Sequence, residues 1–300
     1  MRKYKKSGIF NEIKGRVRFK ESLKRHTSFR IGGAAKFFIQ PKDIADLKLV
    51  LISAKKYNIP VFIVGAGSNI LVDDKGLEAI VLSLSTAYFK KISYSQQYLE
   101  AGSGFSLNRM VSGAARHGLS GLEFLIGIPG TLGGALAMNA GAWGKKIADI
   151  VENVTVADYH GNIKKLDRKN IRFVYRGSSL QRYIIINARL RLCKKKKKEI
   201  QNTICEYLKA RRSSQGDLAL SAGSIFKNPT SGSPAGKLIE QCGLKGRRIG
   251  DAYVSPKHAN FILNKNKASS TDVIKLISLI RRRVKDKFNI ELEPEIKIWR

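Results

Sequence analysis

Hydrophobic and polar positions in the first part of the chain follow the spacings of short strands and of one helix. Apolar residues within 36–40 predict a strand that ends before Pro41. The next segment repeats apolar residues at helical spacing behind a capping Asp43, which predicts an amphipathic helix. Pro60 stops this pattern, and VFIV at 61–64 predicts a buried strand. The apolar stripe of the predicted helix consists of Ile44, Leu47, Leu51 and Ala54.

A glycine-containing loop, GAGSN at 65–69, follows that strand. A Rossmann loop needs a third glycine and must open a helix, so that a pyrophosphate meets the helix N-terminus. Here Ile70 occupies the third glycine position, and residues 71–72 and 79–82 have the apolar character of strands. The loop therefore joins two strands, and its backbone N–H groups predict an anion-binding nest.

The most glycine-dense stretch is 118–144, where eight of 27 residues are glycine. A helix is predicted just before it, from Leu107 to a stop at Gly118. Because Leu, Ile, Phe and Met fill the spaces between the glycines, the stretch is no flexible linker. Such a segment suits close backbone approach to a large, flat, partly anionic ligand. A tight barrel corner or a helix–helix contact is the alternative.

The remaining pattern combines hairpins with three helices. Val154 and Val156 alternate with polar residues before a turn at His160-Gly161. Strands are predicted at 173–180, at 183–192 and at the C-terminal ELEPEIKIW, 291–299. Helices are predicted over 196–213, in AGKLIEQC before Gly243, and in TDVIKLISLIRRRVKDKF, 271–288. In SAGSIFKNP, 221–229, small residues around Ser224 suit a ligand contact, and a strand end running into a loop is the alternative.

The formal charge of +33 is the compositional outlier. It raises the possibility of a nucleic-acid-binding protein, because Lys and Arg neutralise phosphates. The basic residues are spread along the chain, with one dense run at 194–198, and neither a zinc-finger spacing nor an aromatic-rich RNA-binding signature is present. We therefore expect at most non-specific nucleic-acid binding. The run at 194–198 is also the predicted domain junction.

Three scattered cysteines and four scattered histidines predict neither a disulfide framework nor a metal site. The basic leader has no apolar core of signal-peptide length, and nowhere do 18 apolar residues run together. We expect a soluble, cytoplasmic protein with no membrane association and no obligate protein partner.

The chain contains, in this order, the four segments TSFRIGG (27–33), GAGSNILVDDKG (65–76), GLEFLIGIPGTLGGALAMNAGAWG (121–144) and SAGSIFKNP (221–229). Together they resemble the UDP-N-acetylenolpyruvoylglucosamine reductase (MurB) family. VSPKHANFILN at 254–264 and LEPEIKI at 292–298 extend the resemblance to the C-terminus. The short stretch between Tyr175 and Ser221 resembles the type II form of the family.

The resemblance implies an enzyme of peptidoglycan-precursor synthesis. With NADPH and bound FAD, it would reduce UDP-N-acetylglucosamine enolpyruvate to UDP-N-acetylmuramate. The implied fold is α+β, with a FAD-binding module of the vanillyl-alcohol-oxidase (PCMH) type. Two α/β subdomains, 1–82 and 83–195, would form this module. A smaller α/β substrate-binding domain, 196–300, would follow, with its C-terminal strand returning to the active site.

The resemblance also implies site residues. Ser224 would donate a proton, Arg176 would stabilise developing negative charge, and Glu295 would polarise the enolic acid. FAD would be bound by one residue of the first motif and by two glycine-containing segments, and the substrate by four residues near Ser224. The FAD set is Arg30, Gly65, Ala66, Gly67, Ser68, Asn69, Ile70, Gly127, Ile128, Pro129, Gly130, Thr131, Gly133 and Gly134. The substrate set is Lys227, Asn228, Lys257 and His258.

Three positions depart from the family pattern. Gly216 and Leu220 stand where proline is common, and Trp143 stands where tyrosine is usual. These three departures bear on local loop geometry. An FAD-dependent oxidase of sugars or alcohols with the same flavin fold remains the alternative enzyme.

Overall fold

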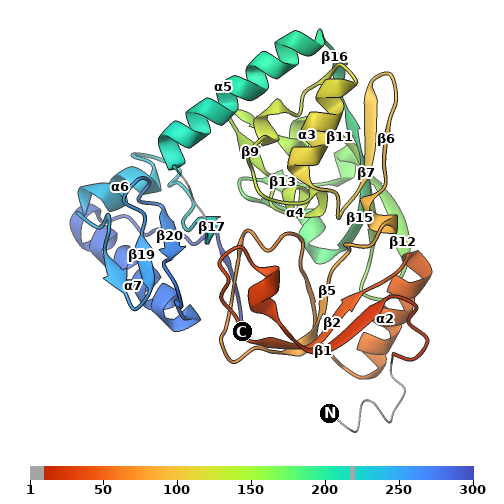
Figure 1. Ribbon diagram of the computed structural model, residues 1–300, viewed down its shortest axis with the longest axis horizontal. Helices are drawn as coiled ribbons and strands as arrows, with labels where there is room; N and C mark the ends of the chain where they lie inside the picture. The colour runs from red at the N-terminus through yellow and green to blue at the C-terminus, as the bar shows by residue number, and fades with distance from the viewer. Residues whose placement is uncertain (1–9, 217–219) are drawn as a thin grey trace. The chain divides into compact units, whose positions relative to one another are not determined.

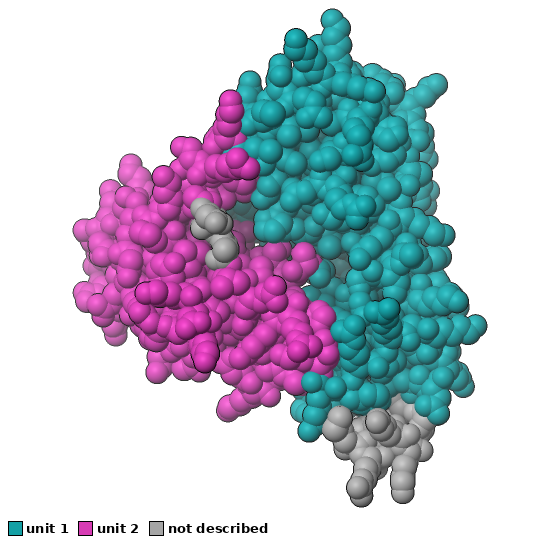
Figure 2. All heavy atoms as spheres, viewed as in Figure 1, with its two compact units in different colours: residues 1–20, 36–65, 78–208 teal, residues 21–35, 66–77, 209–300 magenta. Residues whose placement is uncertain are grey.

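The computed structural model describes residues 10–216 and 220–300, so most of the basic leader and part of GDLAL, 216–220, lie outside the described residues. The chain forms two compact units (Figure 2). Unit 1 consists of residues 1–20, 36–65 and 78–208, and unit 2 of residues 21–35, 66–77 and 209–300. The chain thus alternates between the units before it completes unit 2. The three-domain division stays a prediction.

The first sheet of unit 1 has the strand order β1-β2-β5-β3 (Figure 1). Helix α2 (Ile44–Lys56) begins after Asp43, whose side chain accepts a hydrogen bond from the Asp46 N–H at 3.0 Å, so the predicted helix and cap are confirmed. The apolar face of α2 packs with Phe37, Ile39 and Leu82 in one core. The strands are β1 (Arg16–Ser22), β2 (Ala34–Gln40), β3 (Val61–Ile63) and β5 (Leu77–Leu82).

The second sheet of unit 1 is antiparallel, in the order β12-β11-β15-β7-β6. Helices α3 (Leu107–Arg116) and α4 (Leu132–Ala137) share its hydrophobic core. The predicted helix at 107 and the hairpin around His160-Gly161 are confirmed. The strands are β6 (Ile92–Tyr94), β7 (Tyr98–Gly102), β11 (Val151–Ala157), β12 (Ile163–Asp167) and β15 (Ile184–Arg191).

The single strand predicted at 173–180 is wrong. Two short strands, β13 (Phe173–Val174) and β14 (Gly177–Ser178), pair as a hairpin, and a 3₁₀ turn follows at Ser179–Arg182. Arg176 has a φ of 54° in the turn, a left-handed conformation that ends a strand. Two further short strand pairs lie in unit 1. They are β8 (Leu119–Ser120) with β16 (Cys193–Lys194), and β9 (Gly141–Ala142) with β10 (Lys145–Lys146).

Unit 2 contains a sheet in the order β17-β20-β19-β18 with two helices, α6 (Ala235–Gln241) and α7 (Ser270–Phe288). Its core includes residues from all three stretches of the unit, such as Phe29, Leu71 and Ile277. The predicted helices in this part of the chain are confirmed. The sheet strands are β17 (Ser221–Ser224), β18 (Arg248–Ile249), β19 (Ala252–Val254) and β20 (Phe261–Asn264).

A parallel pair, β4 (Ile70–Val72) with β21 (Lys297–Trp299), joins the loop 66–77 to the C-terminus. The strand predicted over 291–299 is therefore too long, because an isolated bridge between Pro294 and Phe226 precedes β21 and proline lacks the N–H of a regular ladder. Helix α5 (Lys197–Gln215) belongs to unit 1 as far as Leu208. Within the described residues, no helix combines the length and apolar character needed to span a membrane.

Candidate active site

Ser28 joins three separated motifs within unit 2. Its backbone N–H and its hydroxyl both contact the carbonyl oxygen of Gly67, at 3.1 and 3.2 Å. The same hydroxyl lies within hydrogen-bond distance of the carbonyl oxygen of Ser221. The TSFRIGG turn therefore holds the GAGSN loop beside the strand that ends at Ser224. Sequence reasoning missed Ser28, although its place inside a quoted motif was a usable signal.

Gly67 allows this close approach. Its φ is +66°, and a Cβ built on it would lie 1.9 Å from the carbonyl oxygen of His26. Successive backbone N–H groups form an anion-binding nest in a turn, or where right-handed and left-handed residues follow one another. Residues 66–70 therefore fit the predicted pyrophosphate loop.

Arg30, also at positive φ, is exposed between the buried Phe29 and Ile31, and its N–H donates to the Thr27 carbonyl at 3.2 Å.

Ser224 and Glu295 are held close to each other by the backbone of unit 2. Ser224 is half-buried and pairs with Phe261 of β20. Strand β17 ends at Ser224, and a loop follows. The N–H of Glu295 donates to the carbonyl of Ile225 at 2.8 Å, one residue beyond Ser224. Asn69 adds a third element, because its side-chain amide donates to the Glu295 carbonyl at 3.3 Å.

Asn260 fixes the backbone that follows Ser224, and sequence reasoning missed it. Its Oδ1 accepts from the Phe226 N–H at 2.9 Å, and its Nδ2 donates to the Phe226 carbonyl at 2.8 Å. Asn260 is buried, with 4% of its surface exposed. A buried amide that satisfies both groups of one residue specifies a single loop conformation. The signal available in the sequence was an asparagine inside the apolar run HANFIL.

The predicted substrate residues have partners of their own in unit 2. Lys227 Nζ lies 2.6 Å from Glu293 Oε1, in a pair that is exposed on the glutamate side. Asn228 Oδ1 accepts from the Ala235 N–H at 3.1 Å, at the start of α6. His258 also lies beside α6, because a Cβ on Gly236 would be 3.2 Å from its Cε1. Lys257 is exposed, and its stem passes 3.1 Å from the Cβ position of Gly216.

His258 is held in its neutral form. Burial is the main cause that lowers its pKa below the usual value, and the Lys245 ammonium acts in the same direction. Its Nδ1 accepts from the Asn260 N–H at 3.3 Å, which requires an unprotonated Nδ1. At neutral pH His258 is therefore a hydrogen-bonding group without charge.

In unit 1 the glycine-rich segment packs against the turn before α3. Leu107 N–H donates to Gly130 at 3.1 Å, Leu132 N–H to Phe105 at 3.0 Å, and Gly133 N–H to Ser103 at 2.8 Å. Thr131 caps α4, a short helix that the glycine content had hidden. Gly65 also approaches this segment, since a Cβ there would lie 2.6 Å from Thr131 Oγ1.

Arg176 is held on the same segment by the hairpin β13–β14. Its Nη1 donates to the Gly141 carbonyl at 3.2 Å. Ser178 Oγ donates to the Leu136 carbonyl at 2.8 Å, and Asn139 Nδ2 donates to the Val174 carbonyl at 2.9 Å. Ser178 and Asn139 were not predicted. Unit 1 thus brings the arginine of VYRGS together with the end of the glycine-rich segment.

The positions that depart from the family pattern are explained by local geometry. Gly216 and Leu220 have φ values of +70° and +56°, which proline cannot adopt because its ring fixes φ near −65°. Trp143 stacks on Tyr207 of α5, with ring centroids 5.0 Å apart and planes 3° from parallel. The larger ring at 143 therefore has a partner within unit 1.

The residues present fit FAD. Residues 65–70 form a turn of the kind that receives a pyrophosphate, and in unit 1 the backbone of 130–133 is held by its neighbours. Ser103 Oγ, 5% exposed and beside Gly133, has no hydrogen-bond partner within the described residues, which fits a bound polar group nearby. Residues 10–216 and 220–300 contain no group of three or more His, Cys, Asp or Glu side chains that could hold a metal ion.

Family models match both parts of the chain. Residues 215–299 match the C-terminal domain of UDP-N-acetylenolpyruvoylglucosamine reductase, and residues 35–167 match an FAD binding domain. A UDP-N-acetylenolpyruvoylglucosamine reductase of Symbiobacterium thermophilum is 42% identical, over 95% of this chain and 92% of its own length.

Solved structures agree with these matches. The crystal structure of the reductase (MurB) from Thermus caldophilus has a TM-score of 0.81 and 35% identity, and covers 96% of this chain and 100% of its own. A BBE-like protein of Physcomitrella patens shares the fold alone, with a TM-score of 0.58 and 11% identity over 93% of this chain and 88% of its own. The predicted α+β fold with a PCMH-type FAD module is confirmed. Extensive identity over almost the whole length of both chains has one consequence: this chain belongs to the UDP-N-acetylenolpyruvoylglucosamine reductase (MurB) family.

Proposed function

We propose that this protein reduces UDP-N-acetylglucosamine enolpyruvate to UDP-N-acetylmuramate with NADPH, through bound FAD, in the synthesis of peptidoglycan precursors. One observation supports this most directly: backbone and amide hydrogen bonds hold Ser224, Glu295 and the GAGSN loop together in unit 2. Hydride chemistry needs a cofactor, because no side chain can supply a hydride. A proton donor beside the cofactor loop is what reduction of a carbon–carbon double bond requires in addition.

The residues that would hold FAD come from both glycine-containing segments. Gly65, Ala66, Gly67, Ser68, Asn69 and Ile70 would bind the pyrophosphate through their backbone, and residues 127–134 would lie along the flavin. Arg30 is proposed as a further contact. When bound, FAD supplies the hydride that the methylene carbon of the enolpyruvyl group receives, with NADPH as its source.

Ser224 Oγ is proposed to donate the proton that completes the reduction at the neighbouring carbon. A serine hydroxyl is a weak acid, so the step depends on a strongly basic acceptor and on fixed geometry. The pairing of Ser224 with Phe261 and the double hydrogen bond of Asn260 to Phe226 supply such geometry.

Arg176 is proposed to stabilise the negative charge that develops on the substrate carboxylate. Its planar guanidinium suits two-point contact with an oxyanion. The Gly141 carbonyl and the hairpin turn orient this side chain before substrate arrives. Glu295 is proposed to polarise or protonate the enolic acid. Its backbone anchor at Ile225 places it beside the proton donor.

Asn228, Lys257, His258 and Lys227 are proposed to bind the UDP-sugar. Lys227 would leave Glu293 and bind the substrate instead. Breaking this ion pair costs little free energy, because surface ion pairs are weak. We also propose that the enzyme acts in the cytoplasm without an obligate protein partner and binds nucleic acid at most non-specifically.

The visible spectrum of the purified protein tests the proposal. The flavin band should bleach with NADPH under anaerobic conditions and recover only when UDP-N-acetylglucosamine enolpyruvate is added. Failure of NADPH to reduce the flavin, with bleaching by a sugar or alcohol instead, would favour the oxidase. A colourless protein that takes up no FAD would contradict both.

A further inference from the structure

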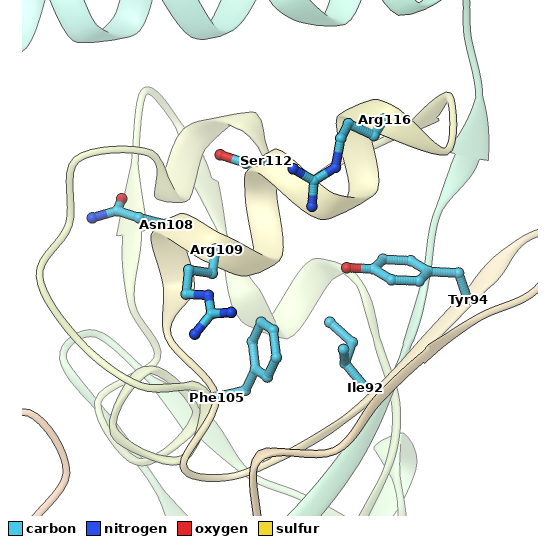
Figure 3. A pocket seen from close by; sticks show the side chains of 7 residues that line it. All are labelled: Ile92, Tyr94, Phe105, Asn108, Arg109, Ser112 and Arg116. Carbon is cyan, nitrogen blue, oxygen red and sulfur yellow. The ribbon is translucent and has the colours of Figure 1, made fainter. Parts of the chain in front are cut away.

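Unit 1 contains a cavity of about 480 Å³ between helix α3 and the edge strand β6 (Figure 3). None of the residues that line it belongs to the proposed catalytic or cofactor set. It is lined by Ile92, Tyr94, Phe105, Asn108, Arg109, Ser112 and Arg116.

Two arginines give the cavity its charge. Arg109 and Arg116 lie seven residues apart on α3, which places them on one face of the helix, above the side chains of β6 and Phe105 (Figure 3). The lining contains no carboxylate. In the part of the chain that the structure describes, neither arginine forms an ion pair. Two guanidinium groups facing one hollow without a counter-charge attract an anion.

The opposite wall is apolar. Ile92 and Phe105 are half-buried, and the Arg109 guanidinium lies 5.9 Å from the centroid of the Phe105 ring. Tyr94 packs its hydroxyl against α3 at Gly113, where a Cβ would lie 1.9 Å from Oη. Burial raises the pKa of Tyr94, so the phenol stays neutral. The hollow therefore combines an apolar floor with a cationic rim.

The cavity is connected to the glycine-rich segment by direct hydrogen bonds. Asn108 Oδ1 accepts from the Gly127 N–H at 2.8 Å. The Phe105 carbonyl accepts from the Leu132 N–H at 3.0 Å. A ligand that moves Phe105 or Asn108 would therefore move both ends of the segment 127–132.

We propose that this cavity binds a small organic anion with an apolar or aromatic body, whose carboxylate or phosphate lies between Arg109 and Arg116. Binding is transmitted to residues 127–132 through Asn108 and Phe105. The binding step is independent of the proposed function. Only its consequence for the flavin rests on the role proposed for that segment.

Methyl NMR of the FAD-loaded, full-length protein tests this with phenyl phosphate as the probe. Ile92 reports the cavity, Ile128 the glycine-rich segment, and Ile225 the region of Ser224. We expect a saturable shift of the Ile92 δ1-methyl resonance, with Ile128 moving over the same concentration range. The absence of a saturable Ile92 shift, or a shift confined to Ile225, would overturn the site. An Ile128 signal that stays still while Ile92 saturates would overturn the connection.

Matched variants separate the site from the general charge of the protein. In an Arg109→Gln/Arg116→Gln variant, the affinity measured at Ile92 should fall at least about tenfold, as expected when charge-assisted hydrogen bonds are lost. An Arg182→Gln/Arg191→Gln variant removes the same charge from exposed positions of unit 1 and should bind as the unmodified protein does. An equal loss of phenyl phosphate affinity in both variants would show that the probe is attracted by the net charge of the protein alone, and would overturn the site. Inorganic phosphate should bind more weakly than phenyl phosphate, and equal affinity would overturn the apolar part of the site.

Discussion

The side-chain amide of Asn69 donates a hydrogen bond to the backbone carbonyl of Glu295, 226 positions further along the chain, at 3.3 Å. The Asn69 carbonyl in turn accepts from the Lys297 N–H at 3.0 Å. One residue of the predicted pyrophosphate loop thus sets the backbone of the proposed catalytic glutamate. Cofactor loop and glutamate are parts of one hydrogen-bonded structure within unit 2.

Replacement of the Asn69 amide should lower both the stability of the protein and its affinity for FAD. We expect Asn69→Ala to lower the free energy of unfolding by about 1 kcal/mol, the net value of one such hydrogen bond. FAD affinity should fall in the same variant, as measured by titration of the apoprotein. Asn202→Ala, on the exposed side of α5, is the control and should change neither quantity. Unchanged FAD affinity in Asn69→Ala would contradict the role of the loop.

Removal of the Ser224 hydroxyl should separate the two half-reactions. In Ser224→Ala, flavin reduction by NADPH should keep its rate, while reoxidation by the enolpyruvyl substrate should slow by about 10²-fold or more, the usual range for a lost general acid. Anaerobic stopped-flow absorbance measures each step separately. Ser231→Ala, exposed beyond the motif, should leave both unchanged. If reoxidation in Ser224→Ala keeps its rate, another group donates the proton.

A side chain at Gly67 should be tolerated far less well than at another left-handed glycine. Gly67→Ala combines a φ of +66° with a Cβ only 1.9 Å from the His26 carbonyl oxygen. Gly246→Ala has a similar φ, +75°, but open space around its Cβ. We expect roughly 1–2 kcal/mol of destabilisation from backbone strain in both, and a further loss of about 1–3 kcal/mol from overpacking in Gly67→Ala alone. Urea unfolding of the two variants measures the difference, and equal losses would contradict the close approach.

Stability should depend on pH through His258. Because burial lowers its folded-state pKa below the unfolded value of about 6.5, the unfolded state binds the proton more readily. The free energy of unfolding should therefore be highest above about pH 6.5 and fall as the pH drops through and below that value. Urea unfolding between pH 7.5 and 5.5 should show a smaller fall in His258→Gln than in the unmodified protein. His160→Gln, at an exposed turn, should retain the full fall, and a His258→Gln profile identical to it would remove His258 as the cause.

Local sequence determined most of the regular elements, because their signals act over only a few residues. Apolar positions at helical spacing predict the helices α2, α3 and α7. The preference of aspartate for the first position of a helix predicts that Asp43 caps α2. The rejection of a Rossmann loop also stands on short-range pattern, since Ile70 begins strand β4. The family resemblance needed only the order of its motifs.

Tertiary structure decided what depends on partners far along the chain. Arg176 lies in a hairpin turn and not in a strand. The hairpin is held by the Ser178 hydroxyl, which donates to the Leu136 carbonyl of α4, and by the Asn139 amide, which donates to the Val174 carbonyl. The C-terminal strand is short because Phe226 bridges to Pro294, and Lys227 pairs with Glu293. No periodic pattern of the sequence predicts these contacts or the cavity beneath α3. Each of them requires a hydrogen bond, an ion pair or packing between segments that are distant in the chain. Such positions are set by the free energy of the folded unit as a whole, and a short window of sequence does not contain them.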